Sequence, residues 1–147
     1  MNEINNFDKY EALKLKNQLC FPLYACSKEV IKKYRPYLEE IGLTYTQYIT
    51  MMVLWERKAI SAKELGEALF LDSGTLTPVL KSLALKGFLT RERSKDDERI
   101  LLLELTQKGE ELKEMACEIP LKLASCVNLS KEESLTLYNL LYKLLRE

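Results

Sequence analysis

Histidine is absent from this chain of 147 residues, and its absence excludes several classes of enzyme. Imidazole is the commonest general base and the commonest metal ligand, so Ser-His-Asp and Cys-His catalytic sites are ruled out. The four cysteines form no CxxC pair, which disfavours a structural zinc site. We therefore expect a protein without a metal, without a cofactor and without enzymatic activity.

Long apolar runs are also missing, and none reaches the about 18 residues that a membrane-spanning helix requires. The N-terminal sequence MNEINNFDKYEALKLK is polar and lacks the apolar core of a signal peptide. We expect a cytoplasmic protein that makes no membrane contact and keeps its thiols reduced.

Glycine and proline are scarce, at 5 and 4 residues, which favours a mostly helical chain. The length suits one domain spanning residues 1–147. The net charge is zero, with 22 basic and 22 acidic residues, so a positively charged surface for nucleic acid would have to be confined to one part of the chain. Residues 81–99 hold a modest surplus of positive charge, with six basic side chains against four acidic ones.

Several helix starts are marked by capping boxes, in which Ser or Thr is followed three residues later by Glu or Gln. Asp72 and Thr106 are further N-cap residues, and Gly42 and Gly87 suit helix ends. The boxes occur at Thr44–Gln47, Ser61–Glu64 and Ser130–Glu133.

Two longer helices are expected to bend at prolines. The first covers residues 9–34, with Pro22 inside it, and Arg35–Pro36 marks its end or a second bend. The second covers residues 106–124, with a kink at Pro120. The pattern therefore places one proline two residues after Cys20.

Residues 61–109 contain two short helices, a hairpin and the start of another helix. The predicted strands are residues 88–93 and 100–105, joined by the polar turn SKDDER. This order predicts a winged helix-turn-helix over residues 44–105, in a mainly α fold with a small β-wing. Residues 1–43 and 106–147 would then be dimerisation helices, because the terminal helices are apolar on more than one face.

The candidate DNA contacts lie in the helix after Asp72 and in the hairpin. Small hydroxyl residues at a helix N-terminus can approach phosphates and base edges, although they can also serve only as caps. Arg99 is the candidate for insertion into a narrow minor groove, and Asp97 is expected to pair with an arginine in the turn. The full set is Ser73, Thr75, Thr77, Lys81, Arg91, Arg93 and Arg99.

A homodimer would place two such reading helices about 34 Å apart, one turn of double-stranded DNA. The expected partner is therefore a palindromic operator. A buried apolar helix in a monomer is the alternative interpretation of the last helix, LTLYNLLYKLL.

Cys20 is the candidate for a reactive thiol, although most buried cysteines are inert. Tyr24 lies one helical turn away, and Tyr34 and Tyr45 lie on nearby elements that could fold back toward it. Phenolic hydroxyls that donate to sulfur would stabilise the thiolate, which is the reactive form. Apolar neighbours would suit a lipophilic peroxide.

The segments LDSGTLTPVLKSL, GFLTRERSKDDER and LTQKG resemble the MarR family of winged-helix regulators, whose DxR-type wing is present here as DDER. The segment LKNQLCFPLYACSKEVIKKYRPYLEEIGLTYTQYITMMVLWE resembles the sensor region of the organic-hydroperoxide-sensing, OhrR-like branch. The resemblance extends from about Leu15 to Leu145, and the sensor segment is its more specific part.

This resemblance implies a repressor that leaves DNA when an organic hydroperoxide oxidises Cys20, with Tyr34 and Tyr45 hydrogen-bonded to the sulfur. The sulfenic acid would then form a disulfide with Cys126 of the partner subunit, or a mixed disulfide with a small cellular thiol. Cys117 is a weaker resolving candidate, and Cys26 is expected in the core.

Two other functions remain open. A MarR-like repressor could release DNA on binding a phenolic or aromatic ligand in a cavity lined by the tyrosines and Trp55. A thiol peroxidase is a poorer interpretation, because no Thr-x-x-x-Cys pattern or arginine partner accompanies Cys20.

Overall fold

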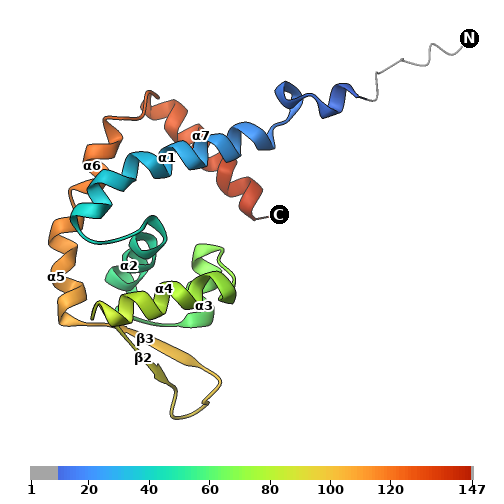
Figure 1. The fold of residues 1–147 in the computed structure, drawn as a ribbon. Helices are drawn as coiled ribbons and strands as arrows, with labels where there is room; N and C mark the ends of the chain where they lie inside the picture. The colour runs from blue at the N-terminus through green and yellow to red at the C-terminus, as the bar shows by residue number, and fades with distance from the viewer. Residues whose placement is uncertain (1–9, 147) are drawn as a thin grey trace, which may run out of the picture.

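The computed structural model describes residues 10–146, which form helices joined by one small antiparallel sheet (Figure 1). The first elements are the 3-10 turns η1 (Glu11–Leu13) and η2 (Leu15–Asn17), α1 (Cys20–Glu40), α2 (Tyr45–Arg57), β1 (Ala59–Ser61) and α3 (Ala62–Leu69). They are followed by α4 (Ser73–Leu85), β2 (Leu89–Arg93), β3 (Leu101–Leu105), α5 (Gln107–Ala116), α6 (Ile119–Ala124) and α7 (Lys131–Leu145).

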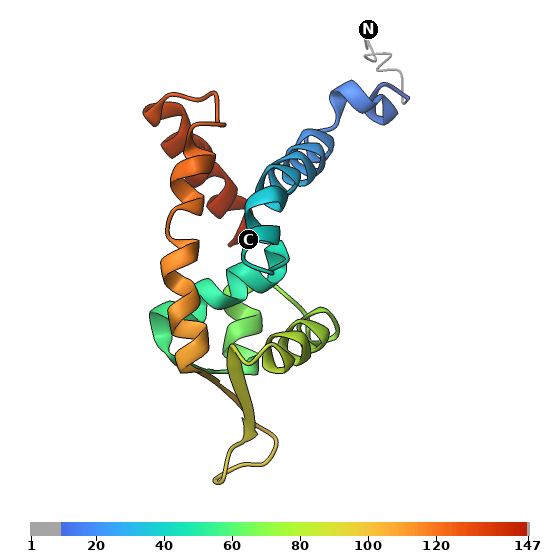
Figure 2. The same cartoon turned by 60° about the vertical axis from the view of Figure 1, so that its left-hand side comes forward.

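The helix-turn-helix and its wing form the lower part of the molecule in Figures 1 and 2. Strand β3 is central in the order β1-β3-β2, and β2 pairs with it antiparallel from Leu89 opposite Leu105 to Arg93 opposite Leu101. The β2–β3 hairpin projects away from the helices as a wing (Figure 2). Helices α5 and α6 lead from the wing back to the end of the molecule that holds α1 and α7.

The core lies where α2, α3 and α4 meet the sheet. Met51, Leu54, Leu65, Leu83 and Leu103 have no exposed surface, and each such burial contributes about 1.5–3 kcal/mol. Helix α5 is joined to this core by a hydrogen bond of 2.8 Å from the Trp55 indole N–H to the Gly109 carbonyl. Gly109 also lies so near the Phe88 carbonyl that a Cβ would be 2.2 Å from the oxygen.

All three capping boxes and the caps at Asp72 and Thr106 are confirmed, because each N-cap side chain accepts from the expected backbone N–H. Gly42 and Gly87 both have positive φ, at 69° and 77°, as residues that end helices require. The hairpin strands are confirmed to within one residue at each predicted boundary. Strand β1 was not predicted, because its three residues are too few to show the alternation of apolar and polar side chains that marks a strand.

The first helix differs from its prediction at both ends. Lys9 lies outside the described residues, and α1 begins only at Cys20, because Lys14 and Gln18 are extended (ψ 128° and 115°) and end two 3-10 turns. Pro22 is consequently in the first turn, where a missing N–H breaks no helical bond and produces no bend. The helix continues through Pro36 to Glu40.

The predicted kink at Pro120 is a complete break between two helices. Helix α5 ends at Ala116, and Pro120 lies in the first turn of α6. A proline ring clashes with the carbonyl four residues earlier, which here belongs to Ala116. The break therefore falls where the ring excludes a continuous helix.

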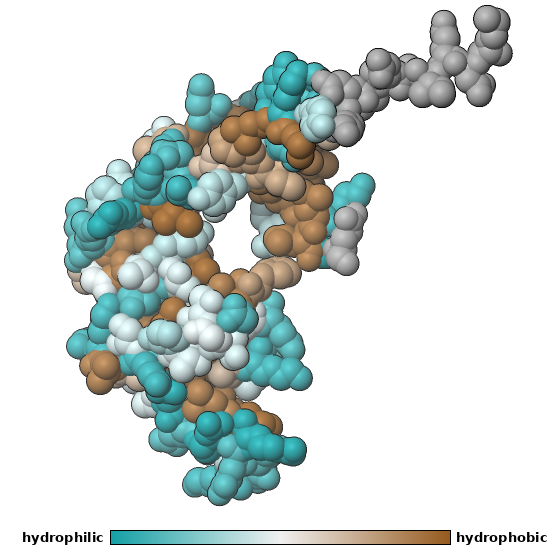
Figure 3. Space-filling model, turned by 45° about the vertical axis from the view of Figure 1, so that its right-hand side comes forward, coloured by the Kyte–Doolittle hydropathy of each residue, from teal (hydrophilic) through white to brown (hydrophobic). Residues whose placement is uncertain are grey.

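The terminal helices leave much apolar surface uncovered. Helix α7 has no buried residue along its length, and Figure 3 shows apolar side chains gathered around an opening in the molecule. The exposed apolar residues of α7 are Leu135, Leu137, Tyr138, Leu140, Tyr142, Leu144 and Leu145. Within residues 10–146, no helix is both long enough and apolar enough to cross a bilayer.

Candidate sensor and nucleic-acid interface

Three tyrosines meet where α1 and α2 pack together. The ring centroid of Tyr34 lies 5.0 Å from that of Tyr45 and 5.9 Å from that of Tyr48, and the first two rings are edge to face. Burial raises the pKa of Tyr34 above its ordinary value, and it is also the main cause of the raised pKa of Tyr45 and of Tyr48. All three phenols therefore remain protonated hydrogen-bond donors at neutral pH.

Trp55 belongs to the core rather than to a ligand cavity. The residue is 8% exposed, and its indole ring lies 6.3 Å from the ring of Tyr48 and donates to the Gly109 carbonyl. Its polar group is therefore already satisfied, which weakens the prediction that Trp55 lines a site for an aromatic ligand.

Cys20 does not meet the tyrosine pair within one chain, so the expectation that Tyr34 and Tyr45 fold back onto it is wrong. Cys20 is exposed at the first position of α1, and Tyr34 lies fourteen residues further on, about 21 Å along the helix axis. Tyr24, one turn from Cys20, is 61% exposed. Among residues 10–146, no hydrogen-bond partner reaches the Cys20 sulfur.

Cys126 lies beside the tyrosine cluster, just after α6. Lys33 donates from Nζ to the Cys126 carbonyl at 3.0 Å. Between α1 and α6 is a groove of about 410 Å³ whose lining includes Lys33, Tyr34, Leu123 and Cys126. The Cys126 thiol is exposed.

The other two cysteines are also exposed, so the expectation that Cys26 packs in the core is wrong. Cys26 lies on α1, which buries only Leu38 along its length. The sulfur of Cys117 is 3.0 Å from the Glu114 carbonyl in the last turn of α5.

Two of the hydroxyl groups at the start of α4 donate to local partners, and the third is exposed to solvent. Thr75 donates its hydroxyl to Asp72 at 3.1 Å, and Thr77 donates to the Ser73 carbonyl at 2.7 Å. Because a hydroxyl has a single hydrogen, these two oxygens remain only as acceptors, which suits base amino groups better than phosphates. The Ser73 hydroxyl has no partner among the described residues, and the side chain of Lys81 is exposed.

The wing tip is fixed by an ion pair, as expected for Asp97. Arg99 donates from Nε and Nη2 to the two carboxylate oxygens of Asp97, both at 3.0 Å, and this guanidinium holds the pKa of Asp97 below its ordinary value. Arg93 donates from Nη1 to the Arg99 carbonyl at 3.2 Å. The Arg99 side chain nevertheless remains 90% exposed, which leaves its outer surface open to a DNA groove.

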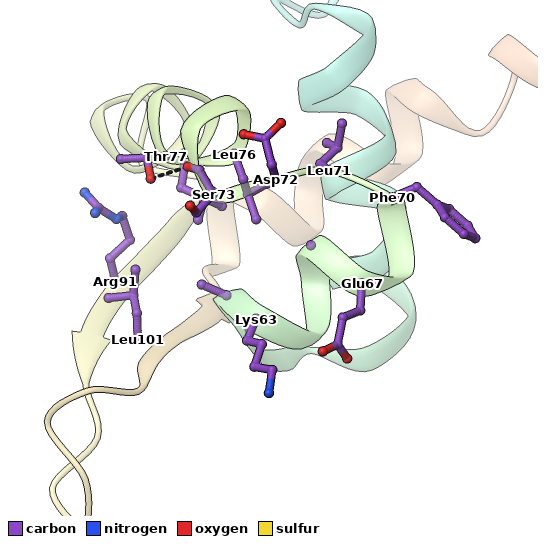
Figure 4. A pocket seen from close by; sticks show the side chains of 13 residues that line it. Lys63, Glu67, Phe70, Leu71, Asp72, Ser73, Leu76, Thr77, Arg91 and Leu101 are labelled. Carbon is purple, nitrogen blue, oxygen red and sulfur yellow. Dashed lines mark hydrogen bonds between the residues drawn. The ribbon is translucent and has the colours of Figure 1, made fainter. Parts of the chain in front are cut away.

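Arg91 lies deeper than the other wing arginines. It lines a cavity of about 650 Å³ between α3, α4 and β3, together with Thr77 and Leu101 (Figure 4). Its Nε is buried and has no hydrogen-bond partner among residues 10–146. Arg91 thus faces the cavity beside α4, whereas Arg93 and Arg99 lie at the exposed wing tip.

Comparison with known proteins assigns the family. Residues 32–115 match the family described as "Transcriptional regulator SarA/Rot". The organic hydroperoxide resistance transcriptional regulator of Bacillus subtilis is 46% identical over 138 residues, which is 94% of both chains. This chain belongs to the MarR family of winged-helix transcriptional regulators, in its organic-hydroperoxide-sensing branch.

Solved structures show the same fold in MarR-family regulators bound to DNA. Reduced AbfR bound to DNA, from Staphylococcus epidermidis, is 35% identical, with a TM-score of 0.78 over 94% of this chain and 96% of that one. A cysteine-to-serine mutant of E. coli MarR in complex with operator DNA is 25% identical, with a TM-score of 0.75 over 94% and 99%.

Sequence reasoning missed three residues of this MarR-family sensor. Tyr48 joins the tyrosine cluster, Lys33 contacts Cys126, and Gln47 bonds to α4 as well as to its capping box. Tyr48 was visible as the second tyrosine of LTYTQY, three residues after Tyr45. The other two contacts join residues 93 and 35 positions apart, so no local pattern indicates them.

Proposed function

We propose that this regulator is a homodimeric, cytoplasmic repressor that binds a palindromic operator and releases it when an organic hydroperoxide oxidises Cys20. The observation that carries the proposal is the Tyr34–Tyr45 pair of half-buried, protonated phenols, placed about 21 Å from the only thiol of the QLCF motif. Donors and thiol can therefore meet only if two chains contribute to one pocket.

The uncovered apolar surface supports the dimer. A helix such as α7, apolar on several faces and without a buried residue, is rarely left in water. Leu19 and Phe21, which flank Cys20, are also exposed. A second copy that covers both chain ends would bring Cys20 of one chain to the tyrosines of the other.

The chemistry at this shared pocket is a two-electron oxidation. The Cys20 thiolate attacks the distal peroxide oxygen, the O–O bond breaks, and the sulfur becomes a sulfenic acid while the hydroperoxide leaves as an alcohol after taking one proton. Phenolic O–H groups of the partner subunit would donate to the thiolate before this step and so favour the reactive form.

Cys126 of the partner subunit is the proposed resolving residue. Because Cys126 and Tyr34 line the same groove, a pocket that receives Cys20 at Tyr34 places the two thiols near one another. The Cys126 thiolate attacks the sulfenic sulfur, the S–O bond breaks as the disulfide forms, and the hydroxide leaves as water after taking one proton from solvent. A small cellular thiol could take the place of Cys126, which would give a mixed disulfide instead.

DNA binding is proposed through Ser73, Thr75, Thr77 and Lys81 of α4, together with the wing arginines. Helix α4 would enter the major groove and Arg99 the adjacent minor groove. Support comes from the exposure of Ser73, Lys81 and Arg99 and from the likeness to AbfR and MarR in complex with DNA. These relatives are regulators, so catalytic turnover is not part of the proposal.

The decisive experiment is operator binding with and without cumene hydroperoxide, on the parent and on Cys20→Ser. Hydroperoxide should release the parent from DNA and leave the variant bound, whereas Cys26→Ser, the matched control on the same helix, should behave as the parent. Release of Cys20→Ser by hydroperoxide would refute the proposal. Release of that variant by phenolic compounds alone would favour a non-covalent ligand.

Non-reducing electrophoresis tests the resolving residue separately. Peroxide should give a linked dimer with the parent and with Cys117→Ser, but not with Cys20→Ser or Cys126→Ser. A linked dimer from Cys126→Ser would show that another thiol resolves the sulfenic acid.

A further inference from the structure

Gln47 has more hydrogen bonds than its capping box requires. Its side chain is 6% exposed in the first turn of α2, two residues after Tyr45. The carbonyl oxygen Oε1 accepts from the Thr44 backbone N–H at 3.0 Å, which completes the capping box. The same oxygen also accepts from Lys86 Nζ at 2.9 Å, and Nε2 donates to Ser82 Oγ at 2.9 Å.

These additional bonds connect the sensor to the DNA-reading helix. Ser82 lies in the last turn of α4, and Lys86 caps that helix. Lys86 Nζ donates in addition to the Gly42 carbonyl at 2.7 Å, in the turn that joins α1 to α2. The end of α1, the start of α2 and the end of α4 are therefore tied together by two side chains.

The position of Gln47 links this network to the tyrosine pair. Tyr45 and Gln47 share one helical turn, whose geometry is fixed by the Thr44 cap. A displacement of Tyr45 by one or more ångströms would move the whole turn. The Gln47 carboxamide would then pull on Ser82 and Lys86 or leave buried polar groups unpaired, which is costly.

We infer that Gln47 is a positioning residue that transmits movement of the tyrosine pocket to α4, acting through Ser82 and Lys86. The inference rests on the proposed function, because it assumes that oxidation of Cys20 displaces Tyr45. Helix α4 keeps its place in the reduced state through buried Leu80 and Leu83. Loss of the Gln47 bonds should therefore impair DNA release more than DNA binding.

Three full-length variants test this coupling. Gln47→Met keeps the length of the side chain and removes all of its hydrogen bonds, whereas Ser82→Ala removes the bond to Ser82 and leaves the bond to Lys86. Ser61→Ala is the matched control, because it removes the N-cap of α3 without touching the turn that holds Tyr45 and Gln47.

The readout is the ratio of operator dissociation constants after and before cumene hydroperoxide, at equal Cys20 oxidation measured by intact mass. Gln47→Met and Ser82→Ala should each lower this ratio by about tenfold, within the usual range of coupling between sites. The Ser61→Ala ratio should equal that of the parent. A simple loss of stability would not move the ratio at equal oxidation.

The outcomes separate the two proposals. If the parent releases DNA on oxidation and Gln47→Met does so equally, the coupling through Gln47 is refuted while peroxide sensing stands. If the parent itself keeps its operator when Cys20 is oxidised, both fail. Should Gln47→Met not fold, the double variant Ser82→Ala with Lys86→Met decides, because it removes both bonds between Gln47 and the end of α4.

Discussion

Replacement of Gly109 by alanine probes the contact that holds α5 on the winged helix. A Cβ at this position would lie 2.2 Å from the Phe88 carbonyl oxygen and 2.7 Å from a Leu105 methyl. Two other helical glycines provide graded comparisons. A Cβ at Gly66 would lie 2.8 Å from the Leu71 carbonyl, and one at Gly74 would lie 3.0 Å from a carboxylate oxygen of Asp72, at the end of a side chain.

The change in the free energy of unfolding expected for Gly109→Ala is the sum of three contributions. Alanine gains about 1 kcal/mol over glycine in a helix. Relief of the clash with backbone atoms costs about 1–3 kcal/mol, and displacement of α5 weakens the Trp55–Gly109 hydrogen bond by about 1 kcal/mol. The net destabilisation is about 1–3 kcal/mol, which lowers Tm by roughly 3–10 °C in a chain of this size.

Thermal unfolding followed by circular dichroism would rank the three variants. Gly109→Ala should have the lowest Tm and Gly66→Ala an intermediate one, while Gly74→Ala should match the parent to within a few degrees, because the Asp72 carboxylate needs to shift by only a few tenths of an ångström and can keep its capping bond to the Thr75 N–H. A Gly109→Ala variant as stable as Gly74→Ala would refute the reasoning, since it would mean that the backbone of Phe88 yields freely.

Two further predictions concern the DNA-binding surface. Lys81→Ala should lower the slope of log K against log salt concentration by about 1.8, because each subunit of the dimer would lose one phosphate contact, worth about 0.9; an unchanged slope would remove Lys81 from the interface. Asp97, whose pKa is lowered by Arg99, should keep the wing tip fixed from neutral pH down through the ordinary carboxyl range and release it only as pH falls through its depressed pKa. Asp97→Asn should loosen the tip at neutral pH as well, and NMR signals of residues 94–99 that titrate at or above the ordinary value for aspartate would contradict the ion pair.

Local signals predicted much of the fold. Thr44, Ser61, Asp72 and Ser130 cap the helices that they were expected to cap, because capping is decided within four residues of chain. The hairpin was predictable for the same reason. A proline inside a helix either bends the helix or breaks it. The sequence predicted a bend at Pro120, and the structure has a break.

Long-range contacts could not be predicted from the sequence. The start of α1 at Cys20 reflects extended backbone at Lys14 and Gln18, where the composition favoured a longer helix. Tyr34 and Tyr45 lie together in the structure, but their distance from Cys20 depends on the straight course of α1. The bond from Gln47 to Ser82 joins residues 35 positions apart and has no signature in either neighbourhood.

The straight course of α1 also bears on when sensing is possible. If reactive sulfur and activating phenols always come from different copies, an isolated subunit is insensitive to peroxide however well it folds. Each assembled pair then holds two independent detectors. Peroxide sensitivity would consequently depend on protein concentration, and it would fade on dilution before the individual chains unfold.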